Sequence, residues 1–390
     1  MSDVPTAGLP SELRLGIDGD ALRNPLSGVG RYILNLCREL ERILPNAHLF
    51  AYSRFPRTRL VLPSARWVLR TEPSKVFRRL PSFVWLKTRG GQMCRRDRLH
   101  LFWAGRTLHP RLSEPVCTVC SVHDLNHLIV PETMQRATLW SHRVWFEKDV
   151  ALAHAVVANS HGTAARVGKL LHRQVSGIVA PGLAEDFRSV RQNAPEVVRE
   201  LAAIGVVSPY LLSVATLEPR KNAGALIRAF VALKRAGKLA DYRLVLAGTM
   251  GWPRGELRRL LSQAARYGVV TTGYVKDELL PTLYARAELF VLPSFYEGFG
   301  MPVLEARACG TKVLVSDIPE LREAAGSGGV AVEASVAGLT EGIERALATP
   351  NLEDGGALVE SCSWTRAAEQ LAEILVQAVR KQMLGQRRSV

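Results

Sequence analysis

Residues 288–308 read ELFVLPSFYEGFGMPVLEARA, and the fold class can be inferred outward from them. The apolar run Glu288–Leu292 predicts a buried strand, and Met301–Ala308 predicts a helix. Pro302 suits the first turn of that helix, because its missing N–H would have no intrahelical partner there. The segment between strand and helix should therefore lie at the carboxyl edge of a parallel sheet, where open α/β sheets bind ligands.

The same alternation of strands and helices extends in both directions and predicts βαβ units. In the second half, strands are expected at Tyr210–Ala215, Tyr242–Ala247, Val269–Thr272, Glu288–Leu292, Lys312–Ser316 and Val330–Val332, with helices at Ala223–Lys234, Gly255–Tyr267, Glu278–Ala285 and Met301–Ala308. In the first half, strands are expected at Leu13–Ile17, Val116–Val122 and Ala155–Ala158, with helices at Gly30–Ile43, Thr138–Ala153 and His161–Leu171. The alternation of predicted strands and helices is interrupted near residues 183–205. We therefore expect one α/β domain over 1–190 and another over 191–364.

Charge is distributed unevenly along the 390 residues. The net charge is +15, and the stretch Arg54–Arg111, with 15 basic and two acidic residues, carries +13 of it. Such a patch attracts polyanions: nucleic acid, an anionic membrane surface or phosphorylated lipids. Aromatic residues alternate with the basic ones, which is typical of a membrane interface, although a solvated face with its aromatics in the core fits the same pattern. The residues expected on this membrane or acceptor face are Arg78, Arg79, Trp85, Arg95 and Arg96.

No apolar run reaches the length of about 18–20 residues that spans a bilayer. Six scattered cysteines are typical of a reducing compartment. We therefore expect a cytoplasmic protein, peripheral on the inner face of the cytoplasmic membrane.

Two loops at the predicted sheet edge carry groups suited to an anion and to a hydroxyl-rich ligand. After the strand at 288–292, the Gly298–Met301 N–H groups would surround a helix N-terminus and hold an anion or sugar hydroxyls. Glu297 and Glu305, the latter expected in the first helical turn, can accept hydrogen bonds from hydroxyls. Arg220 and Lys221 can neutralise a diphosphate, although a solvated basic turn has the same composition.

These residues closely resemble the motifs of family 4 glycosyltransferases. The matching segments are the glycine-rich loop Ser27–Tyr32, the strand-end histidine in Ser121–Leu125, the basic turn Thr216–Asn222, and Gly273–Glu305 with its two glutamates. The family has the GT-B fold, in which two Rossmann-like α/β domains with parallel sheets face a central cleft. The resemblance also implies that the last helix, about residues 365–385, packs back on the first domain.

The resemblance implies a role for each matching residue. Glu305 would bind the donor ribose, and Arg220 and Lys221 its diphosphate. Glu297 would act at the transferred sugar, and His123 would contact that sugar from the acceptor side.

The remaining donor contacts follow from the same resemblance. Gly28 and Gly30 would let the backbone approach the phosphates, and the Val275 backbone would lie near the base. Many members carry an arginine where this chain has Thr216, which leaves Arg220 to take its place. The implied donor-binding residues are Gly28, Gly30, Arg220, Lys221, Val275, Gly298, Phe299, Gly300, Met301 and Glu305.

The resulting hypothesis is a retaining hexosyltransferase that uses GDP-mannose and a lipid-linked saccharide acceptor in O-antigen, capsule or exopolysaccharide synthesis. It needs no metal or other cofactor, since Asp18-Gly19-Asp20 has a metal-binding spacing but ends the first strand. Two alternatives remain open: a nucleic-acid-binding protein using residues 54–111, which leaves the glutamates unexplained, and a GT-B sugar-nucleotide epimerase.

Overall fold

A computed structural model describes residues 12–112, 116–188, 195–251, 255–350 and 362–387. The chain divides into two compact units. Unit 1 comprises residues 1–127, 134–182 and 363–390, and unit 2 comprises residues 128–133 and 183–362. The main boundary after Gly182 lies a little before the one expected at residue 190, and the last helix belongs to unit 1.

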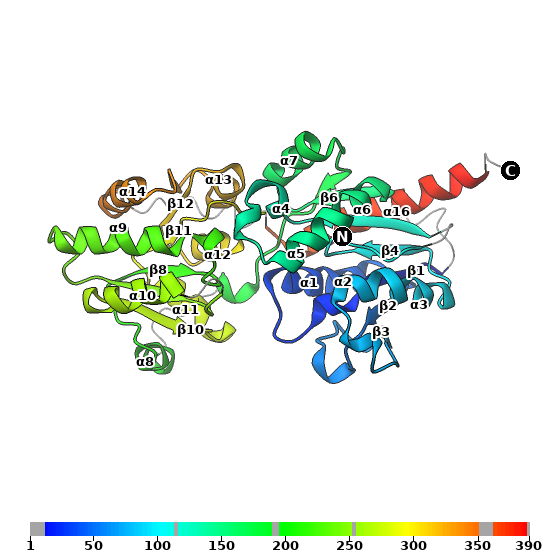
Figure 1. Cartoon of the computed structure of the whole chain (residues 1–390), viewed down its shortest axis with the longest axis horizontal. Coiled ribbons are helices and arrows are strands. Elements are labelled where there is room, and N and C mark those ends of the chain that lie inside the picture. Colours follow the sequence, from blue (N-terminus) through cyan, green and yellow to red (C-terminus); the bar gives the residue numbers. More distant parts are fainter. Residues whose placement is uncertain (1–11, 113–115, 189–194, 252–254, 351–361, 388–390) are drawn as a thin grey trace. The chain divides into compact units, whose positions relative to one another are not determined.

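Unit 1 is built on a parallel seven-stranded sheet in the order β3-β2-β1-β4-β5-β6-β7 (Figure 1). Its strands are β1 (Arg14–Asp18), β2 (His48–Ser53), β3 (Trp67–Thr71), β4 (Leu101–Ala104), β5 (Cys117–Val122), β6 (Ala155–Ala158) and β7 (Gly177–Ile178). Strand β5 is buried at every residue, because helices cover both faces of the sheet.

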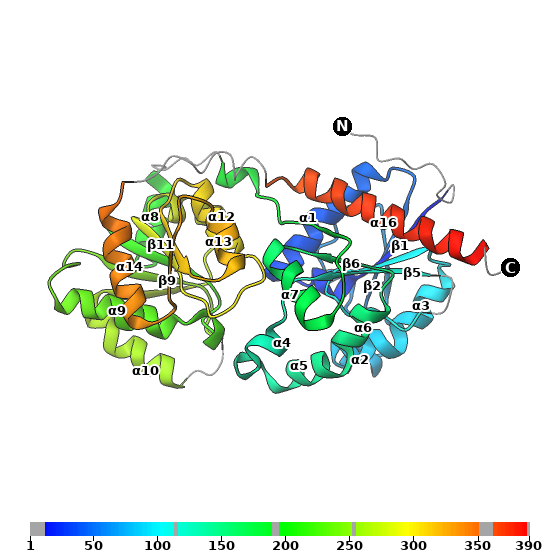
Figure 2. The ribbon, with the colours of Figure 1, turned by 90° about the horizontal axis from the view of Figure 1, so that it is seen from above.

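The helices of unit 1 form a layer on each face of this sheet. Helices α1 and α16 cover one face, and α2, α3 and α6 cover the other (Figure 2). The α-helices are α1 (Gly28–Ile43), α2 (Ser82–Trp85), α3 (Gly91–Arg96), α5 (Arg136–Ser141), α6 (Glu147–Leu152), α7 (His161–Leu171) and α16 (Trp364–Arg387), and the boundary after His127 divides α4 (Asn126–Ile129) between the units. The shorter turns are η1 (Gly19–Leu22), η2 (Arg57–Arg59), η3 (Phe77–Arg79), η4 (Leu86–Gly90) and η6 (His142–Phe146), whereas η5 (Pro131–Thr133) belongs to unit 2. Both η4 and η6 are π-helical and continue the α-helix before them.

Helix α1 shows why the sequence folds in this way. Ser27 caps it by accepting a hydrogen bond from the Gly30 N–H, which satisfies one of the unpaired donors of the first turn. Ile33, Leu36 and Leu40 recur at helical spacing and are buried in the core of unit 1.

Unit 2 repeats the architecture with six parallel strands in the order β10-β9-β8-β11-β12-β13. Its strands are β8 (Tyr210–Val214), β9 (Arg243–Ala247), β10 (Val269–Gly273), β11 (Leu289–Leu292), β12 (Val313–Ser316) and β13 (Val330–Val332). All six strands expected in this half are present, with their ends shifted by one residue at most.

Helices again cover both faces of this second sheet. Helices α9, α10 and α14 lie on one face, and α12 and α13 on the other (Figure 2). The helices and turns are η7 (Glu185–Phe187), α8 (Pro195–Ala203), η8 (Pro219–Lys221), α9 (Ala223–Arg235), α10 (Gly255–Ala264), η9 (Ala265–Tyr267), η10 (Asp277–Leu279), α11 (Leu280–Ala285), α12 (Met301–Ala308), α13 (Pro319–Ala325) and α14 (Val336–Ala348).

Both sheets therefore have the Rossmann-like order, in which the first strand and the fourth are neighbours. The chain reverses direction across the sheet between β1 and β4 in unit 1, and between β8 and β11 in unit 2. Ligands of such sheets bind outside the carboxyl ends of these two strands. Over the described residues, no helix has both the length and the apolar character needed to cross a bilayer.

Candidate active site

The loops after β8 and β11 meet at the reversal point of the unit 2 sheet. Strand β8 leads into η8, which carries Arg220 and Lys221, and β11 leads into residues 293–300. The Phe295 N–H donates to the Arg220 carbonyl at 2.9 Å, which joins the two loops. The structure therefore brings together the basic turn and the glutamate loop.

Glu297 is the centre of this junction. Its Oε2 accepts a hydrogen bond from Arg220 Nη1 at 2.7 Å. Its Oε1 accepts one from Ser294 Oγ at 2.7 Å and another from Lys221 Nζ. Arg220 Nη1 also donates to the Tyr296 carbonyl at 2.7 Å. Two cations, a hydroxyl and a carboxylate thus form one connected cluster at the sheet edge.

The electrostatics of the cluster favour an ionised Glu297. Burial by itself would raise the pKa of this carboxyl, but the charges of Arg220 and Lys221 outweigh burial and lower its pKa to about 2. Burial lowers the pKa of Lys221, and Glu297 opposes that effect. Arg220 Nη2 additionally donates to Glu218 Oε1 at 2.9 Å, so both cations are held in place by carboxylates.

Helix α12 carries the second glutamate. Gly300 precedes the helix with φ +100°, a backbone conformation that favours glycine, and a Cβ there would also meet Leu321 Cδ2 at 2.6 Å. Because the helix begins at Met301, Glu305 lies just beyond the first turn rather than within it, which corrects the expectation. Tyr284 Oη donates to Glu305 Oε2 at 2.8 Å and fixes this carboxylate.

The other donor residues predicted in this half also follow strands. Gly298 and Met301 are half-buried, whereas Phe299 is buried. Val275 is buried after β10, two strands away from β8 in the sheet order. The donor residues predicted in the second half therefore all lie in unit 2, whereas Gly28, Gly30 and His123 lie in unit 1.

Unit 1 has a cavity of about 390 Å³ beside its own reversal point. The side chains that line it combine carboxylates, hydroxyls, an arginine and aromatic rings, a set suited to a polar ring-shaped ligand such as a sugar. The lining includes Asp18, Ser82, Arg106, His123, Asp124 and Phe146.

His123 is fixed at the wall of this cavity. Its Nε2 contacts the Gly105 carbonyl at 2.6 Å and must carry the proton, because a carbonyl only accepts. The Tyr32 ring meets the imidazole edge to face, with centroids 4.9 Å apart. Burial lowers the pKa of His123, so the ring is neutral near pH 7.

The two glycines of the N-terminal loop, Gly28 and Gly30, differ in how much space a side chain would have. A Cβ on Gly30 would meet the Ala21 carbonyl oxygen at 2.6 Å, whereas a Cβ on Gly28 would meet nothing within 4 Å. The Gly30 N–H donates to Ser27 Oγ at 3.1 Å. Gly30 is therefore explained by helix packing and capping, and the access to phosphate predicted for it remains a prediction.

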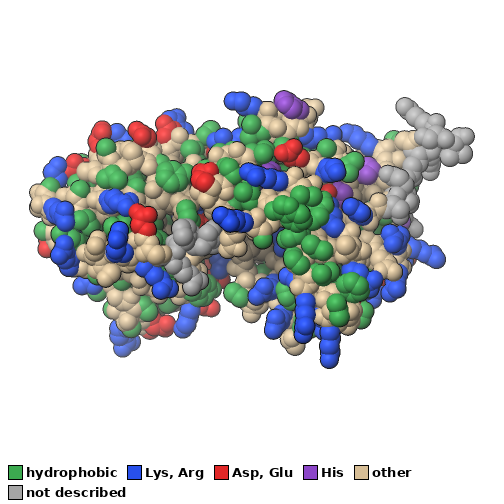
Figure 3. Space-filling model, in the orientation of Figure 1, with side chains coloured by type: hydrophobic (Ala, Val, Ile, Leu, Met, Phe, Trp, Pro, Cys, Tyr) green, Lys and Arg blue, Asp and Glu red, His purple; other side chains and the backbone are tan. Residues whose placement is uncertain are grey.

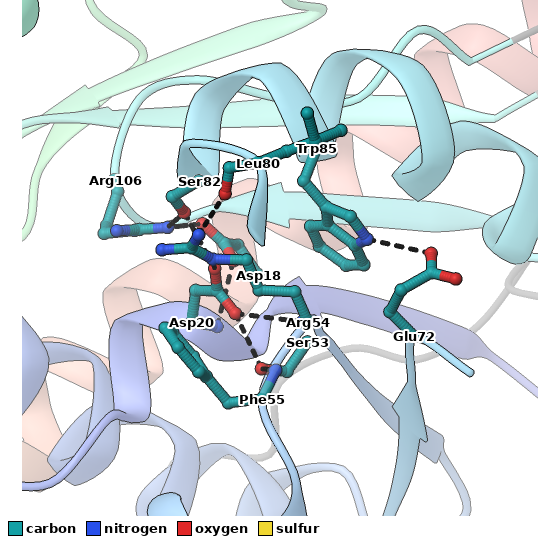
Figure 4. Close-up of polar contacts among 10 residues, drawn as sticks. All are labelled: Asp18, Asp20, Ser53, Arg54, Phe55, Glu72, Leu80, Ser82, Trp85 and Arg106. Carbon is teal, nitrogen blue, oxygen red and sulfur yellow. Dashed lines mark hydrogen bonds and ion pairs between the residues drawn. The ribbon is translucent and has the colours of Figure 1, made fainter. Parts of the chain in front are cut away.

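The carboxylates of the Asp18-Gly19-Asp20 segment are engaged by basic and hydroxyl groups (Figure 4). Asp18 accepts from Arg106 Nε at 2.9 Å. Asp20 accepts from Arg54 Nε at 2.9 Å and Ser82 Oγ at 2.8 Å. In the part of the chain that the structure describes, no group of three or more His, Cys, Asp and Glu side chains is placed to hold a metal ion.

The structure corrects the predicted membrane face at Trp85. This side chain is 0% exposed and its indole N–H donates to Glu72 Oε2 at 3.0 Å (Figure 4). Arg79, Arg95 and Arg96 are exposed, as such a face requires, but Arg78 is half-buried and donates to the Glu72 carbonyl at 2.6 Å.

Several other cations of the basic stretch are also paired inside unit 1. Arg54 pairs with Asp20, Arg70 with Asp97, Lys87 with Asp149, Arg89 with Glu72 and Arg106 with Asp18. Glu72 and Asp97 are already counted in the net charge of +13, so the three carboxylates from outside the stretch, Asp18, Asp20 and Asp149, balance three of these charges and leave most of the excess.

Sequence reasoning missed three groups that shape the two sites. Ser294 and Tyr284 orient Glu297 and Glu305. Arg106 lines the cavity of unit 1 and pairs with Asp18. Its position directly after a strand was a usable signal, but that strand was not recognised in the sequence.

Comparisons with known proteins agree with this architecture. Residues 202–355 match the family model described as "Glycosyl transferases group 1". The chain is 28% identical over 333 residues to O-antigen chain mannosyltransferase B of Escherichia coli, which covers 80% of this chain and 85% of the relative. It is 32% identical over 229 residues to the serotype-specific mannosyltransferase WbdA of Escherichia coli, which covers 56% of this chain but only 27% of that longer protein.

Solved structures support the fold over nearly the whole chain. WaaG, a glycosyltransferase involved in lipopolysaccharide biosynthesis, superposes with a TM-score of 0.65 at 17% identity, covering 94% of this chain and 98% of WaaG. The family match and the relatives named as mannosyltransferases favour a glycosyltransferase over a nucleic-acid-binding protein and over an epimerase, which would share the GT-B fold. The chain is therefore a glycosyltransferase with the GT-B fold, whose residues 202–355 match the group 1 family model and whose sequence is similar to mannosyltransferases.

Proposed function

We propose that the enzyme transfers mannose from GDP-mannose, with retention of the anomeric configuration, to a lipid-linked saccharide in surface polysaccharide synthesis. The observation that carries the proposal is the Glu297 cluster, which concentrates two cations and a carboxylate where Rossmann-like sheets bind nucleotides. Two relatives named as mannosyltransferases support mannose as the sugar, and the O-antigen name of the first supports the polysaccharide.

Donor binding follows from the groups at the edge of unit 2. Arg220 and Lys221 offer several N–H donors each, so they can contact a diphosphate while they hold Glu297. As the bond to the sugar breaks, negative charge grows on the leaving diphosphate, and fixed cations stabilise it without reorganisation. Glu305, oriented by Tyr284, is placed to accept hydrogen bonds from the ribose hydroxyls.

Retention is supported by the ionisation of Glu297. A general base is most effective when its pKa is near the working pH, and a carboxylate with a pKa of about 2 is a weak base at pH 7. Both oxygens of Glu297 are also held by Arg220, Lys221 and Ser294, so Glu297 is poorly suited to activating an acceptor for inversion, and the proposal places it at the transferred sugar. His123, neutral and hydrogen-bonded through Nε2, serves as a positioning contact to the sugar.

The cavity of unit 1 is the proposed site of the acceptor saccharide. Asp18 and Asp124 supply carboxylates, and the Phe146 ring supplies an apolar surface for a sugar face. We further propose that the enzyme works without a metal and is cytoplasmic, at the inner face of the cytoplasmic membrane.

Calorimetry with GDP-, UDP-, ADP- and dTDP-sugars tests the donor. Tight binding of GDP-mannose and of GDP alone is expected, and preference for another base refutes the proposed donor. NMR of the product made from GDP-α-mannose tests the stereochemistry, and a β-linked product refutes retention.

A further inference from the structure

Three aromatic rings from separate elements of unit 1 meet at its surface. Phe83 of α2, Trp140 of α5 and Trp145 of η6 have ring centroids 6.2 Å apart for Phe83–Trp140 and 5.4 Å for each of the other two pairs. The Trp140 side chain is nevertheless 55% exposed and Val144 beside it is 39% exposed. We call Phe83, Trp140, Val144 and Trp145 the aromatic face.

The aromatic face is part of a larger apolar patch. Figure 3 shows hydrophobic side chains gathered over α5 and the adjacent α2, with Lys and Arg side chains around them. An exposed tryptophan packed on two half-buried aromatic rings, with an exposed valine beside it, is the kind of apolar patch that marks an interaction surface.

The charges next to the aromatic face are mainly positive. Arg136, Arg143 and Lys148 are exposed on the same α5–η6–α6 segment, against one exposed acid, Glu147. Arg79, exposed at the end of η3, adds a cation close to α2 in the sequence. Tryptophan rings bordered by Lys and Arg are the composition that binds the interface of an anionic bilayer.

The opposite side of the same segment lines the cavity of unit 1. Thr138, Ser141, His142 and Phe146 contribute to its wall, and Phe83 belongs to both the wall and the aromatic face. Both π-helical turns, η4 and η6, lie in these elements and contribute Leu86, His142 and Phe146 to the wall. Such turns are frequent at functional sites.

We propose that the aromatic face docks on an anionic lipid bilayer and presents the cavity to a lipid-linked acceptor. The purpose of this docking rests on the proposed function, but the docking itself does not. A second copy of the chain is a poorer occupant, because pairing two such faces would bring like charges together. A bilayer with anionic headgroups matches both the apolar centre and the basic border.

The test is co-sedimentation of the full-length protein with vesicles of phosphatidylglycerol and phosphatidylcholine, or of phosphatidylcholine alone. The protein should bind the anionic vesicles, and added salt should weaken the binding. Removing two exposed cations with Arg136→Gln and Arg143→Gln should reduce the affinity about 25-fold, at about fivefold for each. The substitutions Trp140→Ser and Val144→Ser remove apolar contact with the bilayer and should reduce the affinity for anionic vesicles at least about tenfold.

Two matched control variants test whether vesicle binding depends on the aromatic face and its cations, and not on exposed apolar or basic residues elsewhere. Leu170→Gln changes an exposed apolar residue on α7, and Arg258→Gln with Arg259→Gln removes two exposed cations from α10 of unit 2. Neither should change vesicle binding more than about twofold, since an exposed substitution away from the contact acts only through weak, screened electrostatics. Circular dichroism verifies that each variant is folded.

Three results would overturn the inference: no binding of the parent to anionic vesicles, unchanged binding of both test variants, or a dimer in light scattering that Trp140→Ser dissociates. Vesicle binding is measured without any donor, and donor binding is measured without lipid. If the parent protein binds GDP-mannose but not anionic vesicles, only the docking surface is refuted. If it binds anionic vesicles but not GDP-mannose, only the proposed donor is refuted.

Discussion

Replacing Glu297 by glutamine removes the charge at the centre of the unit 2 site and keeps the shape of the side chain. The amide cannot accept from Arg220 and Lys221 on both of its ends, because its nitrogen is a donor. Lys221 then loses the counter-charge of Glu297 and Arg220 keeps only that of Glu218, and removing one partner of a buried ion pair is strongly destabilising.

The magnitude follows from the ionisation of Glu297. Its pKa falls from 4.5 to about 2, which at about 1.36 kcal/mol per pKa unit corresponds to about 3 kcal/mol of stability. Because the pKa is depressed in the folded state, this contribution is complete above pH 4.5 and is lost as the pH falls toward 2. The difference between the parent and Glu297→Gln should thus be about 3 kcal/mol at pH 7 and about 1 kcal/mol smaller at about pH 3.5.

Urea unfolding at both pH values measures this difference. Pulsed hydrogen exchange along the titration, read on peptides from β8 and β11, assigns the transition to unit 2. Glu256→Gln is the matched control, since Glu256 forms an exposed ion pair with Arg228 and should contribute less than about 1 kcal/mol. A Glu297→Gln protein within about 0.5 kcal/mol of the parent at pH 7, or a difference that does not shrink in acid, would refute the reasoning.

Three further outcomes are expected. Lys221→Ala and Glu305→Ala should each weaken nucleotide binding about ten- to a hundredfold in calorimetry, because each removes a charged hydrogen-bonding group, and unchanged affinity in both would overturn the donor assignment. Gly30→Ala should lower the unfolding free energy of unit 1 by about 1–3 kcal/mol through its clash with the Ala21 carbonyl, whereas Gly28→Ala should change it by less than about 0.5 kcal/mol. Transfer activity should survive saturating EDTA, and loss with rescue by a divalent ion would reassign the aspartates at the end of β1 to metal binding.

Local patterns in the sequence were sufficient for the α/β class and for most of unit 2. Helix α12, strand β6 and helix α7 have the bounds expected from the sequence. Strands buried on both faces read as apolar runs, and helices carry a 3.6-residue period, so the signal lies within a few consecutive residues. The GT-B fold implied by the resemblance is confirmed by the two sheets and the structural comparison.

The region between α1 and β5 was not predictable in the same way. Strands β2, β3 and β4 were missed, and Trp85 was placed on a surface although it is buried. Basic and aromatic residues alternate there without a clean period. Whether each of these side chains points into the core or to the surface depends on partners distant in the sequence, such as Asp149 for Lys87.

The sequence by itself determined which residues stand at the ends of strands, including Arg220, Lys221 and Glu297. Only the tertiary structure decided that the two cations hold Glu297, because the order of strands places β8 beside β11 although the two segments are far apart in the chain. Tertiary packing also forms the aromatic face, since Phe83 and Trp140 come from separate helices. Periodicity reports the local backbone, whereas charge pairing and surface exposure depend on contacts between segments that no local pattern encodes.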